Sequence, residues 1–188
     1  GEGVMPAHFP PAFELVCQLE GGYAPNDNGR GPVNCGLTQQ TWDDMRKQNP
    51  TWTAYPADVK DLTRPHLSSI YRDHFWAQSG AFRLNDQKLA EAYFLNYINV
   101  DWPRVDESSW KRGNRASIAL QRIAGVKVDG LFGPMSAEAV NHMDPTLVLH
   151  RMNQAILEHY ERLAAEKPAL YADDLKGWKA RLKHLEER

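Results

Sequence analysis

Glu20 is the residue whose type and position best suit acid catalysis. It follows Val16 and Cys17 by four and three residues, so on a helix its carboxyl group projects from an otherwise apolar face. Gly21 and Gly22 end the predicted helix and leave Glu20 in its last turn, where the helix dipole is negative. Both features disfavour the ionised carboxylate, and we therefore expect Glu20 to keep its proton near neutral pH. Such an acid can protonate the leaving oxygen of a glycosidic bond.

The flanking segments must position this carboxyl group. Pro11 can open the helix that carries it, because a proline in the first turn forfeits no hydrogen bond. Residues 23–34 are rich in glycine, proline and asparagine, which predicts a loop or a short hairpin. Thr38 can then cap a second helix, with Trp42 on its inner face. The alternative for Glu20 is a hydrogen bond to a loop amide, or exposure to solvent at a frayed helix end.

The segment from Glu20 to Thr38 resembles the start of the glycoside hydrolase family 108 muramidases, which are phage-type endolysins and related peptidoglycan-cleaving effectors. The resemblance rests on E-G-G-Y at 20–23, on Asp27 and on N-C-G-L-T at 34–38. It implies a lysozyme-like fold, a peptidoglycan substrate and a catalytic role for Glu20. The chain departs from the family where D-N-G-R-G-P-V at 27–33 replaces D-P-G-G-A-T, and where Cys35 replaces an aromatic residue.

Asp27 is the candidate for a second catalytic group, because it is the only acid between Tyr23 and Thr38. It, or a water held by the loop, would stabilise the oxocarbenium-like transition state or the attacking water. The alternative is an aspartate that closes an Asx-turn at residues 26–29.

Five further residues are candidate sugar contacts: Tyr23, Asn34, Thr38, Trp42 and Asn99. Thr38 is explained equally well as a helix cap. Asn99 belongs to F-L-N-Y-I-N at 94–99, which resembles the family segment F-D-x-A-V-N, with Leu95 in place of its aspartate. Its alternative role is to satisfy backbone groups where helices cross.

The C-terminal part resembles a different kind of module. L-Q-R at 120–122 and V-D-G-L-F-G-P at 128–134 are similar to the L-Q-x-x-x-G-x-x-x-D-G-x-x-G motif of helical peptidoglycan-binding modules. The same turns would also suit a region that only braces the catalytic part.

We expect a mainly α, lysozyme-like fold with a small β element or loop beside the cleft and a C-terminal helical subdomain. The predicted regions are residues 10–108, catalytic, and 109–188, peptidoglycan-binding-like.

Cys17 and Cys35 flank the candidate site. They could form a disulfide in an oxidising periplasm, or remain as two half-buried thiols, and we favour the thiols. The sequence contains neither C-x-x-C nor H-E-x-x-H, so a zinc peptidase lacks its usual ligands, and we expect no metal or cofactor.

Composition indicates a globular protein that interacts weakly with polyanions. Of the 188 residues, 42% are hydrophobic and 24% are charged, and the net charge of -2 argues against nucleic acid as a partner. No apolar run is long enough to span a membrane, and no signal segment opens the sequence as printed. We expect a monomer whose partner is the glycan strand of peptidoglycan.

The sequence therefore predicts an N-acetylmuramidase that cleaves the β-1,4 bond between N-acetylmuramic acid and N-acetylglucosamine and lyses the bacterial wall. The alternatives are a lytic transglycosylase, and a non-catalytic peptidoglycan-binding or adaptor protein. We expect it to act in the periplasm of a target bacterium, either as an endolysin released through a holin or as an antibacterial effector delivered by a system such as type VI secretion. An effector would also have an immunity protein as a partner.

Overall fold

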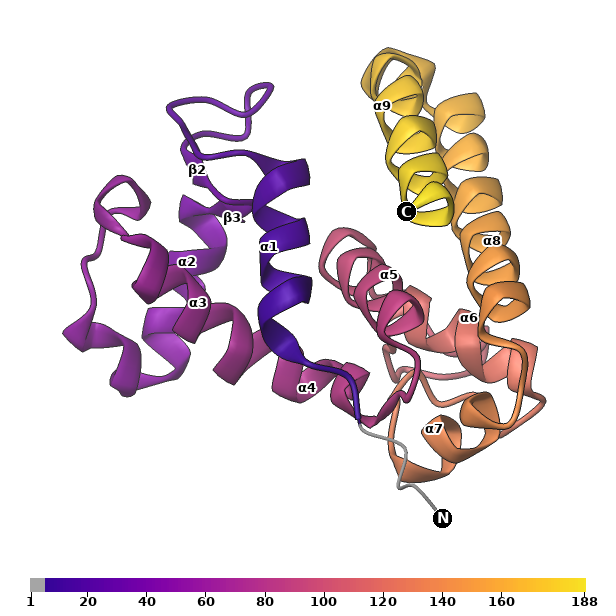
Figure 1. Cartoon of the computed structure of the whole chain (residues 1–188). Coiled ribbons are helices and arrows are strands. Elements are labelled where there is room, and N and C mark those ends of the chain that lie inside the picture. The colour runs from indigo at the N-terminus through magenta and orange to yellow at the C-terminus, as the bar shows by residue number, and fades with distance from the viewer. Residues whose placement is uncertain (1–5) are drawn as a thin grey trace. The chain divides into compact units, whose positions relative to one another are not determined.

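The computed structural model describes residues 6–188, which are mainly helical with a small antiparallel sheet (Figure 1). The chain forms two compact units. The N-terminal unit is Pro10–Phe75, and the C-terminal unit is Trp76–Arg188 together with residues 6–9. The mainly α, lysozyme-like fold class predicted from the sequence is confirmed.

The N-terminal unit carries the small sheet between two helices. Its elements are α1 (Phe9–Glu20), β1 (Tyr23–Ala24), β2 (Val33–Asn34), β3 (Leu37–Thr38), α2 (Gln39–Gln48), 3₁₀ helices at Pro50–Ala54 and Val59–Asp61, and α3 (Arg64–Ile70). The strands are antiparallel in the order β1-β2-β3, with Tyr23 opposite Asn34 and Val33 opposite Thr38. The predicted loop or hairpin is thus a three-stranded element that begins directly after α1.

Local sequence explains the ends of these helices. Gly21, at φ +76°, adopts the left-handed conformation that terminates α1 after Glu20, as predicted. The hydroxyl group of Thr38 accepts a hydrogen bond from the Thr41 amide at 3.2 Å, so Thr38 is the N-cap of α2, again as predicted. Helix α1 begins at Phe9, two residues before Pro11, so Pro11 still lies in its first turn.

A long interrupted helix leads out of the N-terminal unit. Thr63 caps α3, which continues as a π-helical turn at Tyr71–Trp76 and then as α4 (Ala77–Ser79). Gly80, at φ +74°, ends the helix in the left-handed conformation that glycine adopts without strain. A short 3₁₀ helix at Ala81–Arg83 follows.

The C-terminal unit is a bundle of helices around α5 and α8. Its elements are α5 (Gln87–Asn99), α6 (Arg115–Ala124), α7 (Pro134–Asn141), α8 (Pro145–Glu166) and α9 (Pro168–Glu187). Helix α8 packs against α9, α6 and α5, and residues 89–97 of α5 are buried on every side. Helices α7 and α8 each begin with a proline, which forfeits no hydrogen bond in the first turn.

The compact units divide between Phe75 and Trp76, because α5 packs with the C-terminal helices. The sequence-based boundary after residue 108 separates the predicted catalytic region from the predicted peptidoglycan-binding-like region, and it stays a prediction.

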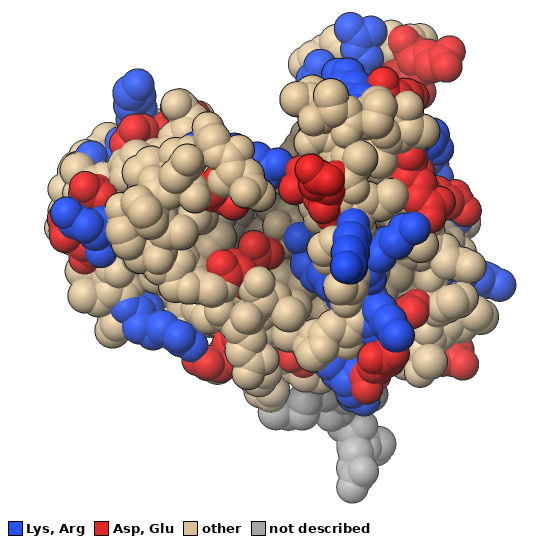
Figure 2. Space-filling model, turned by 90° about the horizontal axis from the view of Figure 1, so that it is seen from above, with Lys and Arg blue, Asp and Glu red and all other residues tan. Residues whose placement is uncertain are grey.

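Within residues 6–188, no helix has the length and apolar character needed to cross a membrane. Basic and acidic side chains both occur on the face drawn in Figure 2, in keeping with the small net charge of -2.

Candidate active site

Glu20 is the last residue of α1 and is partly exposed. The turn between β2 and β3 lies against its side chain: a Cβ atom added to Gly36 would lie 3.0 Å from Cγ of Glu20. The same atom would lie 3.1 Å from the hydroxyl oxygen of Tyr71. The fold therefore brings Glu20, Gly36 and Tyr71 together, and the missing side chain of Gly36 leaves the room that this arrangement needs.

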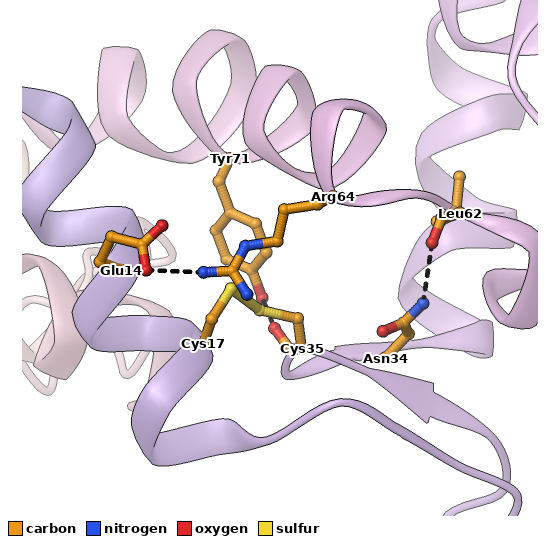
Figure 3. The surroundings of a disulfide bond; sticks show 7 residues. All are labelled: Glu14, Cys17, Asn34, Cys35, Leu62, Arg64 and Tyr71. Carbon is orange, nitrogen blue, oxygen red and sulfur yellow. Dashed lines mark hydrogen bonds and ion pairs between the residues drawn. A yellow bond between two sulfur atoms is a disulfide. The ribbon is translucent and has the colours of Figure 1, made fainter.

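Tyr71, in the π-helical turn after α3, is hydrogen-bonded to the β2–β3 turn. Its buried hydroxyl group donates a hydrogen bond of 2.6 Å to the carbonyl oxygen of Cys35 (Figure 3). Burial raises the pKa of Tyr71 well above its ordinary value, and the nearby charge of Glu20 raises it further. The hydroxyl group thus stays protonated, and it lies within electrostatic range of the Glu20 carboxylate.

Cys17 and Cys35 form a disulfide, with their Cα atoms 5.1 Å apart (Figure 3). The preference for two free thiols was wrong. Cys35 and Gly36 have φ angles of +49° and +80°, so the chain reverses sharply here and returns Cys35 to the helix turn that carries Cys17. The disulfide and the Tyr71 hydrogen bond together hold the β2–β3 turn against the end of α1.

Asp27 lies half-buried in the loop between β1 and β2. The side-chain oxygen of Asn26 accepts hydrogen bonds from the amides of Gly29 and Gly31, at 2.9 and 3.3 Å. Asn26 rather than Asp27 therefore closes the turn. Among the described residues, nothing donates a hydrogen bond to the Asp27 carboxylate, which leaves it available to solvent or substrate. Its catalytic role stays a prediction.

Two of the predicted sugar contacts are buried structural residues. Trp42 is 0% exposed, and its indole N–H donates a hydrogen bond to Pro56 at 2.9 Å. Asn34 is buried, and its amide group donates hydrogen bonds to the carbonyl oxygens of Val59 and Leu62, at 2.7 and 3.1 Å (Figure 3 shows the bond to Leu62). Burial and internal hydrogen bonds give both side chains a structural role, and a sugar contact through either of them stays a prediction.

The other three candidates differ in their surroundings. Tyr23 is 43% exposed on β1, three residues after Glu20, so it is accessible to a ligand. Thr38 serves as the cap of α2. Asn99 belongs to the C-terminal unit, where its amide group donates a hydrogen bond to Leu95 at 2.9 Å. A sugar contact through any of them stays a prediction.

Sequence reasoning did not assign roles to Gly36 and Tyr71. Nothing in the spacing of Tyr71 connects it with a turn 36 residues earlier in the sequence. For metal ions, no group of three or more His, Cys, Asp or Glu side chains suited to a metal occurs in the part of the chain that the structure describes.

The sequence and the fold were compared with known protein families and solved structures. Residues 13–100 match the family model described as Glycosyl hydrolase 108, and residues 115–183 match the Predicted Peptidoglycan domain. A solved structure, SagA of Brucella abortus, is similar over 96% of each chain, with a TM-score of 0.64 and 22% identity, which supports the fold. No curated protein matches the sequence.

The fold and the matched models define a glycoside hydrolase of the lysozyme type. More particularly, the chain carries a domain of the glycosyl hydrolase 108 type at residues 13–100, followed by a peptidoglycan-binding-like region at residues 115–183. It is accordingly a peptidoglycan hydrolase, with peptidoglycan as its partner.

Proposed function

We propose that the protein is an N-acetylmuramidase that hydrolyses the β-1,4 bond between N-acetylmuramic acid and N-acetylglucosamine, and so lyses the bacterial wall. The observation that carries this proposal is the placement of Glu20. It ends α1 beside a turn held by the Cys17–Cys35 disulfide and by the Tyr71 hydroxyl group. A carboxyl group on a rigid support of this kind suits general acid catalysis, which depends on correct positioning.

The chemistry follows from two carboxyl groups of the N-terminal unit, those of Glu20 and Asp27. Glu20 donates its proton to the glycosidic oxygen while the bond from that oxygen to the anomeric carbon breaks. Asp27, or a water held by its loop, stabilises the oxocarbenium-like sugar. A water molecule then adds to the anomeric carbon and gives up a proton to one of the two carboxylates. The carboxylate of Asp27 accepts no hydrogen bond from the described residues. This supports its role in stabilising the sugar cation, because the group is available to substrate.

Digestion of purified peptidoglycan tests the proposal. Wild-type protein should release fragments that end in reducing N-acetylmuramic acid, and Glu20→Gln should be slower by about 10²- to 10⁴-fold. The matched control is Glu14→Gln on the same helix, because Glu14 is exposed and forms a surface ion pair with Arg64, at 2.7 Å. Equal digestion by wild type and Glu20→Gln would refute the assignment of Glu20. Anhydro ends as the main product would instead indicate a lytic transglycosylase.

We also propose that the protein acts in the periplasm of a target bacterium, as an endolysin released by a holin or as an effector delivered by a secretion system. As an effector it would have an immunity protein as its partner, and in either setting a monomer suffices. The disulfide supports a periplasmic site of action, because disulfides persist in oxidising compartments. Exporting the protein to the periplasm of a Gram-negative host should cause lysis that cytoplasmic expression and exported Glu20→Gln do not.

A further inference from the structure

The C-terminal unit contains a cavity of about 300 Å³ that the catalytic proposal does not use. It lies between the end of α5, the segment that follows α5, and the loop before α7. The side chains that matter for its chemistry are Tyr97, Trp102, Asp129 and Leu131. Its volume is at the lower end of the range for small-molecule sites, about 300–1,000 Å³, so it would hold one small ring rather than a long chain segment.

An aromatic surface forms one wall of the cavity. Trp102 is 41% exposed, and its ring meets the ring of Tyr97 edge-on, with centroids 5.8 Å apart and planes at 76°. Arg112 donates a hydrogen bond of 3.1 Å to the backbone carbonyl of Trp102 and holds this segment in place. An exposed indole face carries partial negative charge, which suits packing against the C–H groups of a sugar ring.

Two polar groups beside this wall lack protein partners. Oδ1 of Asp129 accepts hydrogen bonds from Gln121 at 2.8 Å and from the Leu131 amide at 3.0 Å, whereas Oδ2 accepts none from the described residues. The hydroxyl group of Tyr97 likewise has no hydrogen-bond partner within residues 6–188. The cavity therefore offers an acceptor and a hydroxyl group in addition to the aromatic face.

The charge states of these groups are set by their surroundings. Burial raises the pKa of Asp129, but hydrogen bonds from the Leu131 amide and from Gln121 outweigh it, so the net pKa is lowered. Asp129 is therefore an anionic acceptor. Burial raises the pKa of Tyr97 to about 12, which keeps its hydroxyl group protonated as a donor.

The loop that carries Asp129 is rigid. Oε1 of Gln121 accepts a hydrogen bond from the Gly130 amide at 2.8 Å. Gly130 has a φ angle of +73° and packs so closely on Gly113 that a side chain would not fit. The D-G part of the sequence motif thus lines the cavity, Gln121 of the L-Q part holds it in place, and a preformed wall lowers the entropic cost of binding.

We propose that this cavity binds an N-acetylated sugar ring of the glycan strand, which stacks on Trp102 and bonds to Asp129 and Tyr97. The exposed side chain of Leu131 supplies an apolar contact for the acetyl methyl group. The inference rests on the proposed function, since it takes peptidoglycan as the substrate, but it assigns binding to residues that play no part in cleavage.

Binding to insoluble purified peptidoglycan tests the inference, in a Glu20→Gln background that does not consume the polymer. Adding Trp102→Ala should weaken binding about tenfold, because truncating an aromatic anchor removes a large share of the binding energy. The matched control is Trp110→Ala, since Trp110 is 85% exposed in the same unit and does not line the cavity. Tyr97→Phe removes only the hydroxyl group and should weaken binding about fivefold.

Soluble N-acetylglucosamine oligomers should compete for the binding that depends on Trp102, and thermal melting should show that each variant is folded. The inference is overturned if folded Trp102→Ala binds like its parent, if Trp110→Ala loses as much affinity, or if the oligomers do not compete. These outcomes are independent of the cleavage assay. Failure of the catalytic proposal appears as an active Glu20→Gln, and failure of this inference as unchanged binding.

Discussion

Gly36 and Tyr71 both lie beside Glu20 and determine how closely the β2–β3 turn approaches its side chain. Gly36 provides room by lacking a side chain, and Tyr71 provides one hydroxyl group that reaches the backbone of the same turn. Both can therefore be tested by changes of one or a few atoms.

Gly36→Ala should reduce activity at least tenfold and lower the free energy of unfolding by about 1–3 kcal/mol. The new methyl group would press on Cγ of Glu20, 3.0 Å away, and φ is +80°, which is strained for any other residue. The rate of peptidoglycan digestion and denaturant unfolding measure the two effects. Gly22→Ala is the control, because a Cβ atom there meets nothing within 4 Å. An equal loss in that variant would contradict the steric explanation.

Tyr71→Phe should lower the free energy of unfolding by about 1–3 kcal/mol, because it leaves the buried carbonyl oxygen of Cys35 without its donor. Activity should also fall several-fold as the turn beside Glu20 loosens. Chemical denaturation and digestion rates check these effects. Tyr23→Phe, which alters an exposed tyrosine, should leave stability unchanged, and a stable Tyr71→Phe would count against the role given to this hydrogen bond.

At the scale of elements, the small sheet is the part of the N-terminal unit that depends most on cross-links. Its strands have two residues each, too few to be stable alone, and β2 is tied to neighbouring elements by Asn34 and Cys35. The position of the β2–β3 turn against α1 thus depends on tethers as well as on backbone pairing.

The double variant Cys17→Ser, Cys35→Ser should lose about 2–4 kcal/mol of stability, because the disulfide closes a loop between residues 18 positions apart. The loop at 21–34 should also become more sensitive to proteases. Thermal melting with and without a reducing agent measures the effect: the reductant should lower the melting temperature of wild type and leave the variant unchanged. A wild-type protein indifferent to the reductant would contradict the prediction.

At the scale of the whole molecule, each compact unit has its own core and its own electrostatic ties. In the C-terminal unit, Asp101 joins the segment after α5 to α6 and α8, through Arg115 at 2.9 Å and His159 at 3.2 Å. Partial burial raises the pKa of Asp101, but the hydrogen bonds and charges of Arg115 and His159 outweigh it and hold the pKa well below its usual value.

A carboxylate with a lowered folded-state pKa stabilises the protein above its unfolded pKa, near 3.8, and this stabilisation is lost as the pH falls toward the folded value. Asp101→Asn should therefore be less stable than wild type at pH 6, by about 1 kcal/mol or less, because the side chain is half-exposed and screened. The difference should shrink below pH 4. Unfolding at several pH values checks this, with the exposed Asp173→Asn as control, and a difference independent of pH would contradict it.

The sequence alone determined the features that depend on neighbours along the chain. Helix boundaries at Gly21 and Thr38 follow from caps and dihedral preferences. The motif around Glu20 indicated the glycoside hydrolase family, and the motif around Asp129 indicated the peptidoglycan-binding-like region. Local propensity also predicted a small β element after α1, although it could not say how the strands would pair.

Only the tertiary structure decided the features that depend on residues distant in sequence. It paired Cys17 with Cys35 and placed the Tyr71 hydroxyl group against the turn beside Glu20. It also buried Trp42 and Asn34, which the sequence had suggested as sugar contacts. It also brought Tyr97, Trp102 and Asp129 to one cavity. The physical reason is that periodicity shows which residues turn inward, whereas packing and hydrogen-bond satisfaction between elements decide which inward residues meet.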